Sequence, residues 1–85
     1  MAYNILYKKS AAKDFKKLDL PIRKRIIDKI EETLSEKPQQ FPLLRGRFAG
    51  LRKFRIGPYR VIFSVLDDDV WVLRVGHRGD VYKKK

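Results

Sequence analysis

The sequence predicts a small α+β domain in which two helices cover one face of an antiparallel sheet. Residues 51–82 are rich in β-branched and aromatic residues and contain two turn signals, which is typical of a three-stranded meander. Residues 22–34 carry apolar side chains at three- and four-residue spacing, which indicates a helix with one buried stripe. A chain of 85 residues has room for one core, so helix and sheet are expected to pack together in a single domain spanning residues 1–85.

The N-terminal third predicts a strand followed by two helices. The segment Tyr3–Tyr7 alternates in the manner of a short strand, which must dock on the later sheet to be stable. Ser10 is expected to cap a first helix over residues 11–17. Asp19 and Pro21 are expected to separate this helix from the next, because Asp caps helices well and Pro is tolerated in a first turn.

The register of the first hairpin follows from its Gly-Pro turn. If residues 57–58 form a two-residue turn, Arg55 lies opposite Arg60, and Lys53 lies opposite Ile62. Opposed residues share a face, so the three cations are expected to lie on one side of the sheet. The apolar side then carries Phe54, Ile56, Tyr59, Val61, Phe63 and Val65.

The second turn is expected to be a three-residue loop made of the aspartates at 67–69. A shorter loop is rejected, because it would mix polar and apolar residues on each face. The expected pairs are Val65 with Trp71, Phe63 with Leu73, and Ile62 with Arg74. Trp71, Leu73 and Val75 then join the apolar side, and Arg74 and Arg78 join the basic one. Alternation sends Arg52 and His77 to the apolar side, where both are expected to reach solvent along their stems.

The predicted sheet therefore has a basic face, defined by Lys53, Arg55, Arg60, Arg74 and Arg78. Like charges opposed across strands repel each other, so a sequence that keeps them on a folded surface is expected to bind a polyanion there. The net charge of +11 favours nucleic acid or an acidic protein as the partner.

Composition excludes several other classes of protein. The chain has no cysteine, which excludes disulfides and thiolate zinc sites, and its single histidine excludes a pair of catalytic histidines. No metal is expected, because Asp67, Asp68 and Asp69 lie in the second turn and only Asp80 lies near the basic face, which argues against a two-metal nuclease. No apolar run approaches the ~20 residues that a bilayer requires, and the N-terminus lacks the features of a signal peptide, so we expect a cytoplasmic protein.

Four segments of the sequence together resemble the RelE family of toxin–antitoxin systems, over essentially the whole chain. They are Leu44-Arg45-Gly46, Gly50-Leu51-Arg52-Lys53-Phe54-Arg55-Ile56-Gly57, Tyr59-Arg60-Val61-Ile62-Phe63 and Gly76-His77-Arg78-Gly79-Asp80-Val81-Tyr82. The resemblance implies a RelE-like fold and a ribosome-dependent endoribonuclease that cuts mRNA without cofactors. It also implies that a cognate antitoxin silences the toxin.

The resemblance places the catalytic positions of the family on Lys53, Arg55, Arg60, Arg78 and Tyr82. Further RNA-binding cations are expected at Arg45, Arg47, Arg74, Lys13, Lys16 and Lys17. Cleavage without a metal needs a base for the ribose 2′-hydroxyl, cations for the charge that develops on phosphorus, and an acid for the leaving 5′-oxygen.

Each of the five positions has an expected role. Arg60 is assigned to the scissile phosphate, because guanidinium grips phosphate in bidentate fashion, and Arg78 to transition-state charge or the leaving group. Lys53 is a candidate base, since neighbouring cations lower the pKa of a lysine. Where this chain has Arg55, family members can carry lysine, which shifts the role of proton acceptor toward Lys53 or Tyr82. Tyr82 alternatively stacks on a base or packs on the sheet edge.

Two other functions stay open. A toxin that resembles the ParE branch would poison DNA gyrase, and a non-catalytic module would only bind nucleic acid. The expected partners are the ribosome, mRNA and an acidic or amphipathic segment of a RelB-like antitoxin, with no membrane involved.

Overall fold

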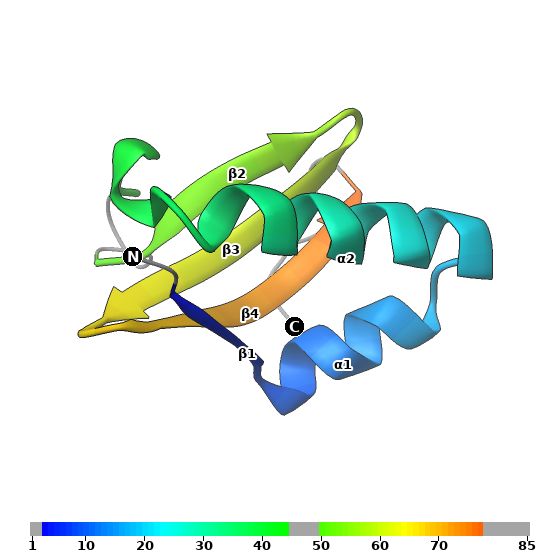
Figure 1. The fold of residues 1–85 in the computed structure, drawn as a ribbon. Helices are drawn as coiled ribbons and strands as arrows, with labels where there is room; N and C mark the ends of the chain where they lie inside the picture. The colour runs from blue at the N-terminus through cyan, green and yellow to red at the C-terminus, as the bar shows by residue number, and fades with distance from the viewer. Residues whose placement is uncertain (1–2, 45–49, 78–85) are drawn as a thin grey trace.

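The computed structural model describes residues 3–44 and 50–77 of the chain. Its elements, in chain order, are β1 (Asn4–Tyr7), α1 (Lys9–Lys16), α2 (Leu20–Leu34), the short 3₁₀ helix η1 (Pro38–Gln40), β2 (Arg52–Ile56), β3 (Tyr59–Leu66) and β4 (Asp69–His77). Figure 1 shows α2 lying across one face of the sheet, with α1 beside β1 and β4. The predicted α+β architecture, with one strand, two helices and a meander, is confirmed. Within the described ranges, no helix has the length and apolar character that a bilayer crossing needs.

The sheet has four strands in the order β1-β4-β3-β2. The three C-terminal strands form the predicted antiparallel meander. The N-terminal strand docks on this meander as expected, and it runs parallel to β4, with Asn4 opposite Asp69 and Tyr7 opposite Val72. The chain can make this parallel pair because both helices lie between β1 and the meander and carry the chain back.

The register of the first hairpin is as predicted. Arg55 lies opposite Arg60, and Lys53 lies opposite Ile62. Gly57 has a φ of 59°, a left-handed conformation that glycine adopts without steric cost, so the two-residue Gly-Pro turn forms.

The prediction for the second turn is wrong. Leu66 pairs with Asp69, so the turn has two residues, and the first of them, Asp67, has a φ of 55°. Aspartate tolerates this conformation better than most residues, and two-residue turns with positive φ suit the twist of a hairpin. The pairs expected for Val65 and Phe63 therefore do not form, and these residues lie opposite Val70 and Val72 instead.

A β-bulge then restores the predicted register farther along β4. The register shifts between Ile62 and Phe63, so that Ile62 lies opposite Arg74 as expected and Leu73 is the extra residue. Val70 and Val72 are fully buried in the core, whereas Trp71 and Leu73, which were expected there, are half-buried and outside the core cluster. Val70 and Val72 precede the bulge and Val75 follows it, yet all three side chains are buried in the core. Strict alternation would place Val75 on the opposite face from Val70 and Val72.

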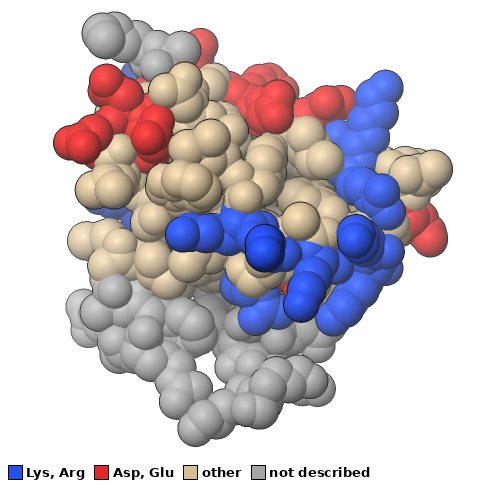
Figure 2. Space-filling model, turned by 90° about the horizontal axis from the view of Figure 1, so that it is seen from below, with Lys and Arg blue, Asp and Glu red and all other residues tan. Residues whose placement is uncertain are grey.

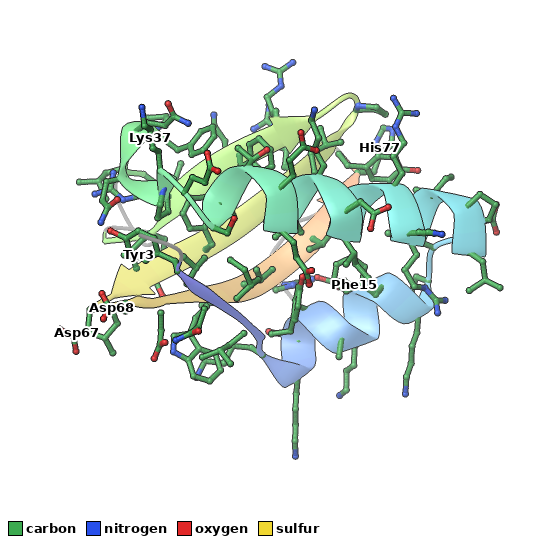
Figure 3. The ribbon with its side chains drawn as sticks, viewed as in Figure 1. Tyr3, Phe15, Lys37, Asp67, Asp68 and His77 are labelled. Carbon is green, nitrogen blue, oxygen red and sulfur yellow. The ribbon has the colours of Figure 1, made fainter. Side chains whose placement is uncertain are left out.

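The core lies between the helices and one face of the sheet. The apolar stripe of α2 is buried as predicted, with Ile26, Ile30 and Leu34 at most 1% exposed. Phe15 projects from α1 toward α2 (Figure 3), and its ring lies 5.8 Å edge-on from that of Tyr7. From the sheet, the buried members of the core are Phe54, Val61, Phe63, Val70, Val72 and Val75.

Helix α1 covers the part of β4 that β1 leaves open. The strand β1 ends opposite Val72, so the next backbone groups of β4 would form an exposed edge. The Ser10 hydroxyl donates to the Leu73 carbonyl at 2.6 Å, and the Val75 N–H donates to Asp14 Oδ2 at 2.9 Å. The prediction that Ser10 caps α1 is therefore wrong. The helix begins at Lys9, and the Ser10 hydroxyl ties it to the sheet.

Candidate functional site

The described members of the basic face lie on the sheet side that points away from the core. Lys53 and Arg55 flank Phe54 on β2, and Arg60 precedes Val61 on β3. Phe54 and Val61 are buried under the helices, and side chains alternate along a strand, so the three cations point to the other side. Arg45, Arg47, Arg78 and Tyr82 lie outside the described residues, so their predicted roles stay predictions.

The register gathers the cations into two adjacent rows across the sheet. One row reads Lys53, Ile62 and Arg74, and the other reads Arg55, Arg60 and Gly76. Opposed side chains in a sheet lie about 4.5–5.5 Å apart at Cβ. Ile62, between Lys53 and Arg74, is 1% exposed, while Gly76 leaves the position beside Arg60 without a side chain. Four cations therefore surround a small part of one sheet face.

The cations differ in how firmly they are held. Arg55 is exposed, whereas Lys53 and Arg60 are half-buried, and the Nε atom of Arg60 is withdrawn from solvent. A partly buried guanidinium loses less conformational entropy when it binds a ligand than an exposed one does. Arg60 is therefore the more buried of the two opposed arginines of the hairpin.

Arg74 is tied to helix α1 by an ion pair that sequence reasoning missed. Its Nε and Nη2 atoms donate to Asp14 Oδ2 and Oδ1 at 2.8 and 3.2 Å. The hydrogen bond to Asp14 raises the pKa of Arg74, and burial offsets part of this rise. Asp14 is 7% exposed. A signal was present in the sequence, because Asp14 lies three residues after Ala11 and beside Phe15 on the buried side of the helix, where a carboxylate needs a partner.

Because Asp14 fastens α1 beside Arg74, the lysines of this helix extend the positive surface. Lys13, Lys16 and Lys17 are exposed, as predicted. Seen from below, Lys and Arg side chains form a band across the middle and right of the view, and most acidic side chains lie toward the upper edge, with others at the right edge (Figure 2).

The acidic turn lies at the far end of the sheet from the row of Arg60. Figure 3 shows Asp67 and Asp68 at one end and His77 at the other. Arg60 and Leu66 lie at opposite ends of β3, and six residues of strand span about 20 Å. The carboxylates of this turn are therefore too distant to neutralise Arg55 and Arg60.

Two residues on the core side of the sheet have structural contacts. Arg52 was expected to reach solvent, but its Nη1 atom donates to the carbonyls of Gln39 and Phe41 at 3.1 and 2.7 Å, which holds η1 against the sheet. His77 is exposed, as expected, and its ring lies edge-on to that of Tyr59 at 5.7 Å.

Comparison with known proteins places this geometry in a family. The family model described as the ParE toxin of the type II toxin–antitoxin system parDE matches residues 5–82. A search of curated proteins finds no match.

Several solved structures share the fold. The toxin–antitoxin complex RelBE2 from Mycobacterium tuberculosis has a chain with a TM-score of 0.85 and 30% identity, and the match covers 94% of this chain and 95% of that one. A variant of the toxin RelE from Escherichia coli in the free state has a TM-score of 0.74 and 28% identity, over 93% and 86% of the two chains. The ParDE system of Pseudomonas aeruginosa has a TM-score of 0.75 at 16% identity, over 89% and 96%, which shows a shared fold. The chain belongs to the RelE/ParE family of toxins of type II toxin–antitoxin systems.

Proposed function

We propose that this chain is a ribosome-dependent endoribonuclease that cleaves mRNA by attack of a ribose 2′-hydroxyl on the neighbouring phosphate, without a metal ion. The observation that carries the proposal is the pair of rows that brings Lys53, Arg55, Arg60 and Arg74 together on one sheet face. Cations are the groups that this reaction needs in quantity, because negative charge builds up on the phosphate oxygens in the transition state. The higher identity to RelE structures than to the ParE structure supports this branch of the family.

In this mechanism Arg60 holds the scissile phosphate. Its side chain is half-buried, and the position opposite it on β4 is Gly76, which has no side chain. Lys53 lies in the adjacent row and acts as general base or as a second electrostatic contact. The roles of Arg78 and Tyr82, support of the leaving group and stacking or proton exchange, rest on the family resemblance.

The test is cleavage of a defined mRNA on programmed ribosomes by the purified chain, stripped of bound metal with EDTA before it is added. The expected products end in a 2′,3′-cyclic phosphate and a 5′-hydroxyl. Arg60→Ala is expected to cut about 10²–10³-fold more slowly, the usual effect of removing a group that stabilises transition-state charge. Lys24→Ala, which removes an exposed cation on α2, is the matched control and is expected to cut like the wild type.

Two outcomes would contradict the proposal. One is message that stays intact when the wild-type chain occupies the ribosome. The other is message cut equally fast by Arg60→Ala and Lys24→Ala. If Arg60→Ala weakens binding of RNA while no message is cut by any variant, the chain is a nucleic-acid-binding module.

A second candidate function is inhibition of DNA gyrase, which is expected of the ParE branch. The matching family model is described as the ParE toxin. A supercoiling assay with purified gyrase separates the two. The endoribonuclease proposal predicts unchanged supercoiling at toxin concentrations that cut message completely, and a stoichiometric block of supercoiling would favour the gyrase inhibitor.

We also propose that an amphipathic, acidic segment of a RelB-like antitoxin binds this chain in the cytoplasm. The structures of relatives include toxin–antitoxin complexes. A pocket of about 320 Å³ lies between the start of α2 and the turn after β2, and the apolar residues Ile22, Ile56, Pro58 and Tyr59 line it with Arg25. An apolar pocket beside a cation suits a segment that combines apolar and acidic residues. Co-purification with the product of an adjacent small gene, and its loss in an Ile22→Asp variant, would test this partner.

A further inference from the structure

The unexpected register of β4 places Trp71 on the same sheet face as the basic rows. It lies opposite Ser64 on β3 and Leu6 on β1. Its neighbours Val70 and Val72 are fully buried in the core, so alternation points the indole to the other side, where it is half-buried. An indole on this face has no part in the hydrophobic core.

A cation accompanies the ring. The Nζ atom of Lys8 lies 4.7 Å from the centre of the Trp71 ring, within the range of a cation–π contact. Lys8 is exposed and directly follows β1, and its backbone N–H donates to the Val72 carbonyl at 2.9 Å, which fixes its position beside β4. An aromatic plane next to an ammonium group is the combination that binds a base and its phosphate in single-stranded nucleic acids.

Trp71 and Lys8 lie near the rows of cations on the basic face. Ser64, opposite Trp71, lies two residues from Ile62 and four from Arg60 on the same side of β3, which corresponds to about 7 and 13 Å along the strand. A strand of RNA a few nucleotides long can therefore reach Trp71 while a phosphate lies at Arg60.

We propose that Trp71 and Lys8 form a subsite for one nucleobase and its phosphate in single-stranded RNA, next to the site of cleavage. The proposal rests on the proposed function in so far as the ligand is RNA. The base stacks on the indole, and the Lys8 ammonium, displaced from the ring or beside it, contacts the adjacent phosphate.

Trp71 reports on this subsite directly, because it is the only tryptophan of the chain. The probe is a 2′-O-methyl oligoadenylate of about ten nucleotides, which lacks the attacking hydroxyl and has a length in the usual range for such sites. Saturable quenching of Trp71 fluorescence is expected with this RNA. Inorganic polyphosphate is expected to compete with the RNA through charge but to quench the free protein much less than the RNA does, because it has no base to stack on the indole.

Variants separate stacking from charge. Trp71→Ala is expected to bind a labelled copy of the RNA ~10-fold more weakly, with a smaller loss for Trp71→Phe, which keeps a ring. Log affinity falls as log salt rises, and Lys8→Gln is expected to make this fall less steep by about 0.7, the effect of losing one phosphate contact. Leu66→Ala, which shortens an exposed side chain at the end of β3, is the control and is expected to bind like the wild type. Circular dichroism melting of each variant identifies any loss of folding.

Equal quenching by polyphosphate, or wild-type affinity in a folded Trp71→Ala variant, would overturn the proposal. Its failure is distinguishable from that of the proposed function. If message on ribosomes is cut while the RNA fails to quench Trp71, the subsite is wrong and the endoribonuclease stands. If the RNA quenches Trp71 while no message is cut, the subsite stands and the endoribonuclease is wrong.

Discussion

Asp14→Ala is expected to cost this small domain a large part of its stability. The Asp14 carboxylate accepts hydrogen bonds from Arg74 and from the Val75 N–H, and Val75 is 2% exposed. Loss of the acceptor for this buried N–H costs about 1.5–3 kcal/mol, the range for hydrogen bonds to a charged group. The Arg74 side chain is 39% exposed and regains water, so its share is at most about 1 kcal/mol. The total is about 1.5–4 kcal/mol, where whole domains have about 5–15 kcal/mol.

The measurement is urea unfolding followed by circular dichroism, for the wild type, the two single variants Asp14→Ala and Arg74→Ala, and the double variant. The double-mutant cycle isolates the ion pair, which we expect to contribute at most about 1 kcal/mol. Asp14→Asn keeps an oxygen for the Val75 N–H and is expected to lose less than Asp14→Ala. A free energy of unfolding for Asp14→Ala within about 0.5 kcal/mol of the wild type, the usual scatter of surface substitutions, would refute the view that this carboxylate closes the edge of β4.

Three further predictions concern other parts of the fold. Burial, followed by the charge and hydrogen bond of Glu31, raises the pKa of Tyr7 above its ordinary value near 10, so the folded state holds this proton more tightly than the unfolded state. The associated stability is complete below about pH 10 and is lost at higher pH, and Tyr7→Phe is expected to show a flatter decline in alkaline unfolding titrations. Gly57→Ala is expected to cost about 1–2 kcal/mol in urea unfolding through its φ of 59° alone, since an added Cβ meets no atom within 4 Å. Arg52→Met is expected to speed hydrogen exchange at the Phe41 amide, because two carbonyls around η1 lose their donor.

Local rules were enough to predict the elements and the first hairpin. The apolar spacing of α2 predicts one buried helix face, and the Gly-Pro turn predicts one register that gathers apolar residues on a single sheet face. Both predictions are confirmed. The positions of Lys53, Arg55 and Arg60 on the basic face could be predicted for the same reason, since they follow from that turn.

The second hairpin could not be predicted in this way because two irregularities compensate each other. Compared with the predicted three-residue turn, the two-residue turn shifts the register of β4 by one residue, and the bulge at Leu73 shifts it back. The predicted pair of Ile62 with Arg74 therefore forms, although the predicted turn does not. As a result, Trp71 lies on the basic face and not on the apolar face where it was predicted. The parallel pairing of β1 and the contacts of Asp14 depend on where α1 docks, which is a tertiary feature that neither propensity nor alternation encodes.

The central claim is that the sheet face opposite the helices binds single-stranded RNA. The most direct measurement is the change in backbone amide NMR shifts when isotope-labelled chain is titrated with the 2′-O-methyl oligoadenylate. The largest changes are expected at Lys53, Ile62 and Gly76, with little change at Asp28 and Lys29 on the outer side of α2. Shift changes that gather on α2 and leave the two basic rows unaffected would contradict it.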